Sequence, residues 1–569
     1  MAGGKGFSHE FHKKFIQFVF RGAMKKILII TILVFILLTS CSSQAGTEVA
    51  STAIVDPGPS ATVTLGPTVT IRPTATHIPT FTPAVQDHLT PAILGPDADS
   101  FPAGVNPLTG RAVSDPSLLG IPAMLISISN SPVTARPQAG PGFADWVFEL
   151  FIGTGTTRFL GVFYGEYPRS VPNPVGGCAV RNYIFRPRGK WFGGRVWLDE
   201  NGNDRQDDWE HGIGGICVVL RDATYYVLAQ VSTDRNGYFA FNLVNDAIMA
   251  EVTGPVQLFF KKTDDFEFAT PNLGDDDTDS DVDPATGHTG LFSPQPGSLS
   301  WDAGLRLKVP PAAEEGRVQP IRSGRLTYAT INEMFPFSCL AFAGAGKGIF
   351  EQLDACRVVY GTDSDDVNDG MLTVSEMREL AEANLSYSPI NYSGHLFDPA
   401  APAGGLSAER LQVYYHPLNQ GLWLYDLVSG TYLRWTDFQD GSGKLTPALD
   451  ALTGRQLAFE NVIVIYATHD IFRHLQYDIN IRPGQEGYAY AFRDGQLYKI
   501  RWSTANRTWE QQSGLLRPLH FIWPDKTEFP LKPGRTFIHI MTEFSSVSET
   551  APGNWRAFFV PPNDPAPEP

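Results

Sequence analysis

The sequence predicts a mainly β protein with α+β parts, and three observations carry that prediction. The last third alternates apolar and polar residues in runs such as LQVYYHP, NVIVIYATHD and GYAYAFRDGQLYKIRWS, a pattern typical of antiparallel strands. After Arg325 the pattern turns helical in GKGIFEQLDACR and LTVSEMRELAEAN, both between residues 346 and 384. Residues 193–308 hold 20 acidic and 8 basic residues, so this one segment carries −12 of the formal charge of −16.

Length and composition exclude several classes of protein. The 569 residues predict two to four domains, and 43% hydrophobic with 12% aromatic residues rules out a chain that is disordered as a whole. The excess of 60 acidic over 44 basic residues argues against a nucleic-acid partner, which needs a basic face to neutralise phosphates. The same excess argues against electrostatic attraction to anionic lipid.

The amino terminus predicts the compartment. Twelve apolar residues, Ile27–Leu38, follow Met24-Lys25-Lys26. This apolar stretch is too short to span a bilayer, but together with the preceding lysines it fits a signal peptide. The following Leu-Thr-Ser-Cys ends at Cys41 and resembles a bacterial lipobox. We therefore expect residues 1–41 to be a signal peptide with its true start at Met24. Lipidated Cys41 would then anchor the protein outside the bacterial cell membrane, exposed at the surface. The alternative is an uncleaved anchor with a chance Cys.

Residues 42–100 follow as a Thr- and Pro-rich segment that cannot bury a core. It is either a stalk that lifts the folded part off the membrane or a plain linker. Residues 549–569 are expected to form a Pro-rich tail.

Four cysteines remain in the mature chain, and an extracytoplasmic location permits disulfides. Cys339 and Cys356 lie closest in sequence and are the favoured pair. Four buried thiols are the alternative.

The folded part shows clear local signals. Residues 121–130 and 157–164 predict strands, whereas 143–151 suits a helix or a strand. Thr373 or Ser375 can cap the helix in LTVSEMRELAEAN. Arg493-Asp494-Gly495-Gln496 joins two alternating runs and predicts a hairpin turn.

Several motifs resemble the YerB-like lipoprotein family, which carries the domain of unknown function 3048. They occur in order along the chain: NPLTG at 106–110, ARPQ at 135–138, ADWVFE at 144–149, TRFL at 157–160, PIRSGR at 320–325, FRDG at 492–495 and LKPG at 531–534. The resemblance covers roughly residues 104–192 and 312–545. It implies an α+β N-terminal domain in two parts, 101–192 and 309–400, and a mostly antiparallel β C-terminal domain at 401–548. It implies no established activity.

The acidic segment interrupts that resemblance. Residues 193–308 resemble the B-type domain of serine-aspartate repeat surface proteins, an immunoglobulin-like β-sandwich that often binds calcium. The motifs are GRVWLDENGNDRQDDWE, STDRNGYFAF and GDDDTDSDVD. The predicted fold is therefore an immunoglobulin-like β-sandwich, here called the insert, within a YerB-like host.

Two runs in the insert predict Ca²⁺ ligands. The first places Asp199, Asn201, Asn203, Arg205, Asp207 and Glu210 at positions 1, 3, 5, 7, 9 and 12 of an EF-hand-like loop. Calcium needs six to eight oxygens; position 7 supplies a backbone carbonyl and Glu at position 12 can bind bidentately. Asp204 replaces the usual Gly at position 6, where Asp tolerates the left-handed backbone. A solvated acidic turn is the alternative.

The second run alternates carboxylates at Asp277, Asp279, Asp281 and Asp283, which could form one side of a Ca²⁺ cage. A flexible acidic loop is the alternative, because such repulsion favours an open chain.

The host offers ionisable residues in apolar sequence: Arg136, Asp145, Glu149, Arg158, Arg322 and Arg325. The arginines could hold an anionic ligand and the carboxylates could serve acid–base chemistry on a glycan. An internal network that orients the domain is the alternative. We find no nucleophile motif, no zinc spacing and no phosphate-binding glycine loop, and hence predict no catalytic residue.

Two functions follow. The first is a lipid-anchored surface protein that binds, adheres or spaces at the cell envelope, with wall glycan or surface proteins as partners and a calcium-stabilised sandwich. The second is a cell-envelope enzyme or ligand-binding protein that acts on wall glycan through the host's arginines and carboxylates. Convergence of these side chains in an open cleft would favour the second.

Overall fold

The computed structural model describes residues 93–171, 178, 191–242, 254–308, 315–359, 368–385, 388–506, 508–514 and 517–563. The predicted signal peptide, Cys41 and almost all of the predicted spacer lie outside these residues. Within the described part, no helix is both long and apolar enough to cross a membrane.

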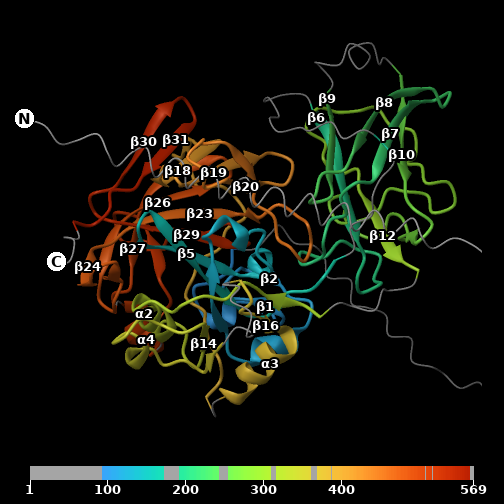
Figure 1. The fold of residues 1–569 in the computed structure, drawn as a ribbon. Helices are drawn as coiled ribbons and strands as arrows, with labels where there is room; N and C mark the ends of the chain where they lie inside the picture. The colour runs from blue at the N-terminus through green and yellow to red at the C-terminus, as the bar shows by residue number, and fades with distance from the viewer. Residues whose placement is uncertain are drawn as a thin grey trace, which may run out of the picture. The chain divides into compact units, whose positions relative to one another are not determined.

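A mixed eleven-stranded sheet forms the centre of the host (Figure 1). Its order is β15-β14-β3-β5-β4-β29-β23-β26-β27-β17, and β28 pairs with β27. The strands are β3 (Met124–Ser129), β4 (Trp146–Gly153), β5 (Thr156–Phe163), β14 (Cys339–Phe342), β15 (Arg357–Val358), β17 (Leu406–Ser407), β23 (Asn461–Tyr466), β26 (Glu486–Arg493), β27 (Gln496–Ser503), β28 (His520–Ile522) and β29 (Thr536–Met541).

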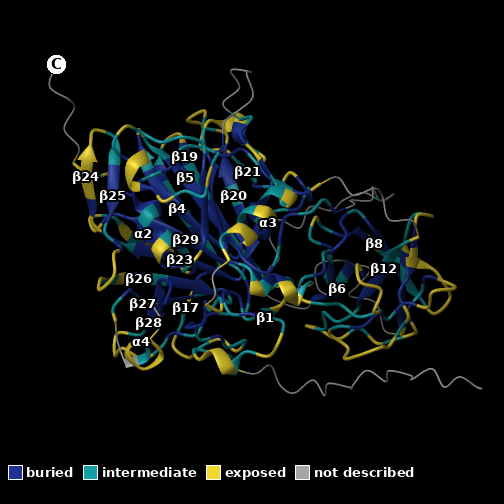
Figure 2. Cartoon of the chain, turned by 90° about the horizontal axis from the view of Figure 1, so that it is seen from below, coloured by how far each residue is buried: buried dark blue, intermediate teal, exposed yellow. Residues whose placement is uncertain are grey.

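The predicted N-terminal and C-terminal parts of the host share this sheet. β29 pairs in parallel with β4, placing Thr536 opposite Trp146, and also pairs in parallel with β23. The ambiguous segment 143–151 therefore forms a central strand from Trp146 onward, buried on both faces (Figure 2). Val147 and Phe151 enter one hydrophobic core, whereas Trp146 and Phe148 enter the core on the opposite face.

A second sheet of seven strands has the order β21-β20-β19-β18-β31-β30, with β22 paired to β20. Its strands are β18 (Arg410–His416), β19 (Asn419–Asp426), β20 (Thr431–Asp437), β21 (Leu445–Pro447), β22 (Ala458–Phe459), β30 (Ser546–Ala551) and β31 (Asn554–Phe558). The last two correct the predicted tail at 549–569. Trp555, Ala557 and Phe559 alternate as buried residues, so the chain remains in the sheet beyond residue 549.

The insert is a two-sheet sandwich with its own core. One sheet has the order β11-β12-β6-β9 and the other β10-β7-β8. The strands are β6 (Trp191–Leu198), β7 (Cys217–Asp222), β8 (Val227–Ser232), β9 (Tyr238–Asn242), β10 (Val256–Lys261), β11 (Phe266–Phe268) and β12 (Ala303–Leu307). The predicted sandwich is confirmed, and β6 begins two residues before the predicted boundary at 193.

Short elements complete the described chain. The helices are α2 (Thr327–Glu333), α3 (Val374–Ala383) and α4 (Thr508–Ser513). Short strands pair as β1 (Val105–Asn106) with β2 (Arg111–Ala112), β13 (Arg317–Val318) with β16 (Leu372–Thr373), and β24 (His469–Arg473) with β25 (Gln476–Ile479). Single 3₁₀ turns cover η1 (Ala98–Ser100), η2 (Pro116–Gly120), η3 (Val133–Ala135), η4 (Pro141–Phe143) and η6 (Phe350–Gln352).

The two helical predictions had different outcomes. Thr373 caps α3 in a full capping box, because its side chain accepts from the Glu376 N–H while the Glu376 side chain bonds back. The predicted helix in GKGIFEQLDACR is wrong, because this segment forms only the 3₁₀ turn η6. Gly348 adopts the left-handed conformation just before the turn, which interrupts a helical path.

The predicted hairpin at 493–496 is confirmed. Arg493 and Gln496 face each other at the ends of β26 and β27. Asp494 and Gly495 have φ values of 53° and 68°, as a two-residue turn between twisted strands requires.

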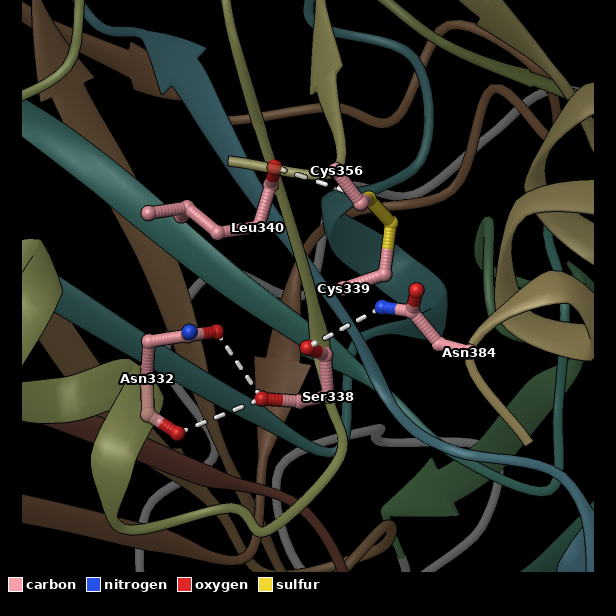
Figure 3. Close-up of a disulfide and its surroundings, with 6 residues drawn as sticks. All are labelled: Asn332, Ser338, Cys339, Leu340, Cys356 and Asn384. Atoms are coloured by element: carbon pink, nitrogen blue, oxygen red, sulfur yellow. Dashed lines mark hydrogen bonds between the residues drawn. A yellow bond between two sulfur atoms is a disulfide. The ribbon is translucent and has the colours of Figure 1, made fainter. Parts of the chain in front are cut away.

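Two disulfides are present. Cys339 at the start of β14 bonds to Cys356, which confirms the favoured pair (Figure 3). The Ser338 hydroxyl beside it donates to Asn332 Oδ1 at 2.9 Å, and Asn384 Nδ2 donates to the Ser338 carbonyl at 3.5 Å. The second disulfide joins Cys178 to Cys217 of β7, with Cα atoms 5.5 Å apart.

Candidate functional site

The first predicted calcium loop winds around the carboxylate of Asp199, directly after β6. Asp199 is buried, and its Oδ1 accepts from the N–H groups of Gly202 (2.7 Å) and Asn203 (3.1 Å). Asp204 has a φ of 63°, the left-handed backbone expected at position 6. The backbone of Asp204 also donates to Asp199 Oδ2 at 3.2 Å. The sequence pattern therefore produces the tight loop it predicts.

The remaining loop ligands are brought together by hydrogen bonds. Asp207 Oδ2 accepts from the side-chain amides of Asn201 (2.8 Å) and Asn203 (2.9 Å). Both oxygens of Glu210 accept backbone N–H groups, from Glu200 (2.8 Å) and Asp207 (3.1 Å). Burial, together with the charges of Asp207 and Asp199, raises the pKa of Glu210 to about 8. Arg205 joins the loop through its backbone, whose N–H donates to Asn203 Oδ1 at 2.8 Å.

A cationic side chain that the sequence reasoning missed lies on this loop. Arg306 of β12 contacts Asp199 Oδ2 and Asp204 Oδ1, each at 2.6 Å. Its guanidinium neutralises two carboxylates near position 1 of the loop. No local signal links Arg306 to residue 199, because β12 and β6 become neighbours only through parallel pairing.

The carboxylates of the second run, residues 277–283, lie in different environments. Asp279 is 4% exposed, and its Oδ1 is buried without a hydrogen-bond partner. Asp281 Oδ2 accepts from the N–H of Asp302 at 2.7 Å, and burial with the charges of Asp279 and Asp276 raises the pKa of Asp281 to about 7. Asp283 instead caps its own exposed turn, accepting from Ala285 N–H at 2.9 Å.

Asp302 is a second residue that the sequence reasoning missed. It precedes β12, is 3% exposed, and its Oδ1 accepts from the N–H of Arg195 at 2.6 Å. Burial and the charge of Asp281 raise its pKa well above the ordinary value. The sequence contained a signal for this residue, because Asp302 directly precedes the apolar run of β12 in SWDAGL.

The two acidic loops contact each other. The N–H of Gln206 donates to the Thr278 carbonyl at 2.7 Å, and its side-chain amide donates to the Asp277 carbonyl at 3.4 Å. In the described part of the chain, no three His, Cys, Asp or Glu side chains converge closely enough to hold a metal ion as they stand. The oxygen donors and the unpartnered Asp279 Oδ1 suit Ca²⁺, whereas Arg306 already neutralises part of the first loop.

In the host, the six predicted residues do not form one cluster. Glu149 of β4 lies in a buried network, where its Oε1 accepts from the Thr157 hydroxyl at 2.6 Å and its Oε2 lies 3.2 Å from both Arg434 and His539 Nδ1. Burial alone would raise the pKa of Glu149, but the charge of Arg434 and the hydrogen bonds lower it to about 2. Trp423 Nε1 donates to His539 Nε2 at 2.9 Å and completes the network.

Asp145 and Arg136 lie in two other environments. Asp145 is buried and accepts from Asn106 Nδ2 (3.0 Å) and from the Tyr164 N–H (2.7 Å), while burial raises its pKa well above the ordinary value. Arg136 donates to the carbonyls of Asn130 (3.0 Å) and Asp437 (2.8 Å), and its Nη2 is buried without a partner.

Arg136 also lines a cavity of about 250 Å³. The wall includes Phe159, Phe438, Arg434, Asp437 and Gln138. This is the candidate ligand cavity of the host.

Arg158, Arg322 and Arg325 are brought together on the opposite face of the sheet from Glu149. Glu149 stands across from Phe159 on β5, and Phe159 belongs to one core. Leu160, the next residue of β5, belongs to the core on the other face of the sheet. Arg158 is two residues before Leu160 on the same strand and therefore lies on that face. Alternation along a strand therefore separates Glu149 from Arg158, although both were candidates for one site.

Comparison with known proteins identifies the parts of the chain. Residues 108–183 match the N-terminal domain of the protein of unknown function DUF3048, and residues 411–538 match its C-terminal domain. Residues 190–305 match the SdrD B-like domain. The chain therefore carries both DUF3048 domains with an SdrD B-like domain inserted between them, as the sequence motifs predicted.

The curated relatives match through the insert. They include serine-aspartate repeat-containing protein D of Staphylococcus aureus (44% identical over 73 residues, 13% of this chain and 6% of the relative). Serine-aspartate repeat-containing protein F of Staphylococcus epidermidis is 42% identical over 65 residues, 11% and 4% of the two chains. A fibrinogen-binding protein of the same species is 33% identical over 86 residues, 15% and 7%. The chain spans less than a tenth of the length of these relatives.

Among solved structures, the YerB protein from Bacillus subtilis is similar, with a TM-score of 0.41 and 16% sequence identity. The match covers 77% of this chain and 96% of that one.

Proposed function

We propose that this protein is a lipid-anchored surface protein whose calcium-stabilised insert is displayed at the cell envelope for binding, adhesion or spacing. The SdrD B-like domain is shared with staphylococcal serine-aspartate repeat proteins, which indicates a surface protein. The observation that carries the proposed calcium binding is the buried, unpartnered Asp279 Oδ1, two residues before Asp281, whose carboxylate accepts from the Asp302 N–H. The anchor rests on the order of charges, apolar run and Cys41 in the sequence.

Bound calcium would stabilise the charged forms of the insert's buried carboxylates. Asp279, Asp281 and Glu210 have raised pKa values because burial and neighbouring carboxylates disfavour their charged forms. A divalent cation supplies the missing counter-charge and accepts oxygen ligands at short range. Asp199, Asn201, Asn203, the Arg205 carbonyl, Asp207 and Glu210 would hold one ion, and Asp277, Asp279, Asp281 and Asp302 another. Arg306 would have to release Asp199 for the first ion to bind.

Thermal melting of the whole chain tests the calcium sites. Millimolar Ca²⁺ should raise the melting temperature of the insert relative to chelator, because a ligand that binds only the folded state stabilises it. Asp281→Asn should reduce that increase, whereas Asp264→Asn, an exposed residue of the same domain, should retain it. An unchanged melting temperature in the wild-type chain would refute calcium binding.

Fractionation and pull-down test the anchor and the partner. Cys41→Ser should move the protein from the membrane fraction to the soluble fraction, and continued retention would refute lipidation. A pull-down from cell envelopes with and without Ca²⁺ should show calcium-dependent capture of wall glycan or surface proteins if the insert presents the binding face.

The cavity beside Arg136 favours a second candidate, a ligand-binding role of the host toward wall glycan. Aromatic walls with a guanidinium donor and a carboxylate suit a sugar ring and its polar groups. Calorimetric titration with a soluble N-acetylglucosamine–N-acetylmuramic acid disaccharide should show saturable binding that Arg136→Gln weakens. Equal binding by the variant would exclude this cavity.

A further inference from the structure

Three arginines of the host lie where the segment 321–325 runs along β3. Arg322 N–H donates to the Ser127 carbonyl at 3.0 Å, and the Ser127 hydroxyl donates to the Ser323 carbonyl at 3.3 Å. Arg158 on β5 stands opposite Ser129 of β3, and its Nη1 is 3.5 Å from the same Ser323 carbonyl. We call Arg158, Arg322 and Arg325 the arginine cluster.

Among the residues that the structure describes, two members of this cluster have no carboxylate partner. Arg158 is 4% exposed and keeps its Nε buried without a partner. Its long contact to the Ser323 carbonyl is the one hydrogen bond that its side chain makes to the described part of the chain. The Nε of Arg325 is also buried without a partner. Burial and the charges of Arg325 and Arg322 lower the pKa of Arg158 to about 9. The buried guanidinium of Arg158 therefore lies close to two other positive charges. This arrangement raises the free energy of the folded state unless an anion neutralises it.

Three other buried arginines of the host have carboxylate partners. Arg434 pairs with Glu149, Arg517 bonds to Glu510 and Glu528, and Arg493 pairs with Asp494. A fourth, Arg455, has no carboxylate partner in the part of the chain that the structure describes: its Nε donates to the Gly212 carbonyl at 2.9 Å, and its Nη1 is buried without a partner. Arg158 and Arg325 differ, because their Nε–H groups remain available for an acceptor from outside the chain.

We propose that the arginine cluster binds a tetrahedral oxyanion, with a phosphate group as the simplest ligand. A guanidinium presents parallel N–H groups along one edge, which match two oxygens of a phosphate. Arg158 forms the buried end of the site, and the partly exposed Arg322 and Arg325 connect it to solvent. Three guanidiniums can share the several oxygens of a phosphate, whereas a carboxylate offers two. The site lies in the host and is independent of the proposed calcium function.

Calorimetric titration and melting of the whole chain test the proposal, with chelator present and ionic strength held constant with chloride. Inorganic phosphate should bind saturably and raise the melting temperature. Glycerol 3-phosphate, in a parallel titration, separates a free anion from the phosphate ester of a larger molecule: whichever binds more tightly identifies the source. Acetate should not compete at equal concentration.

Substitutions locate the site. Arg325→Gln should weaken phosphate binding by about tenfold or more, because it replaces the charged guanidinium with a shorter, neutral polar side chain. Arg158→Met should abolish the phosphate effect and raise the melting temperature in phosphate-free buffer, since it removes a buried unpaired charge. Arg378→Gln, at an exposed arginine paired with Asp115, should behave as the wild type.

Three results would overturn the proposal. One is a phosphate effect no larger than that of chloride at equal ionic strength. Another is undiminished phosphate binding by both Arg325→Gln and Arg158→Met, which would place the anion elsewhere. The third is tighter binding of acetate than of phosphate, which would make the cluster a carboxylate site.

Discussion

Removal of the Glu149 carboxylate should destabilise the host strongly. Glu149→Gln keeps the side chain's size but leaves the Arg434 guanidinium, whose side chain is 5% exposed, without its counter-charge. The pKa of Glu149 falls from 4.5 to about 2 in the folded protein. At about 1.4 kcal/mol for each tenfold change in the equilibrium, this corresponds to about 3 kcal/mol of stability. Breaking a buried ion pair costs a similar amount, roughly 3–5 kcal/mol.

The sign of the pH dependence follows from the same shift. Because folding lowers the pKa of Glu149, its contribution is fully present above pH 4.5 and is lost as pH falls from 4.5 toward 2. The wild-type host should therefore lose stability over that interval, and Glu149→Gln should flatten this part of the profile.

Denaturant unfolding monitored by tryptophan fluorescence is a suitable assay, because Trp423 is hydrogen-bonded into the network. Glu379→Gln, at an exposed position of α3, is the matched control and should change stability by less than about 0.5 kcal/mol. The double variant Glu149→Leu with Arg434→Met should recover much of the loss, since apolar replacement of a buried pair is often neutral. A loss of less than about 1 kcal/mol in the free energy of unfolding of Glu149→Gln would refute the interpretation of Glu149 as a structural residue. Glu149 would then again be a candidate ligand-binding residue.

Three further substitutions test local features by calorimetric melting. Cys356→Ser should cost roughly 3 kcal/mol under oxidising conditions, because the bond to Cys339 closes a loop with a sequence separation of 17, and the difference should vanish in reductant. Thr373→Ala should cost about 1 kcal/mol by removing the cap of α3; an unchanged melting temperature would show that the capping box is dispensable. Gly495→Ala should cost more than Gly484→Ala, since both have positive φ but only a Cβ at 495 meets the Tyr425 ring, at 2.8 Å; equal costs would contradict this steric term.

Local sequence signals predicted the parts of the fold that depend on neighbouring residues. The hairpin at Asp494-Gly495 and the cap at Thr373 follow from turn and cap chemistry, which acts over a few residues. The pairing of β4 with β29 could not be read in this way. It joins residues nearly 400 positions apart, and both strands are apolar on two faces, so neither carries a partner-specific pattern.

The candidate sites show the same division. The loop around Asp199 follows from its spacing, and the structure forms it. Glu149 and Arg158 were grouped because both interrupt apolar sequence, yet the period of two places them on opposite faces of one sheet. The partners of Glu149, which are Arg434 and His539, come from distant strands and had no signal of their own. A charged residue within an apolar run of the sequence therefore indicates that a partner exists. The sequence does not say whether that partner is a side chain or a ligand.

Asp302→Asn separates these two cases in the insert, because the asparagine keeps the Oδ1 that accepts the Arg195 N–H and removes only the charge. The pKa of Asp302 is well above its ordinary value, so the ionised carboxylate destabilises the calcium-free insert increasingly as pH rises above that ordinary value. In chelator at pH 7 the variant should melt at a higher temperature than the wild type. The difference should shrink as pH falls toward and below the ordinary pKa of Asp, because Asp302 then becomes protonated in both the folded and the unfolded state. In millimolar Ca²⁺ the order should reverse, because the ion loses an anionic ligand while the wild-type carboxylate gains its counter-charge. A variant that melts lower than the wild type by the same amount in chelator and in Ca²⁺ would show that the charge of Asp302 stabilises the sandwich independently of calcium.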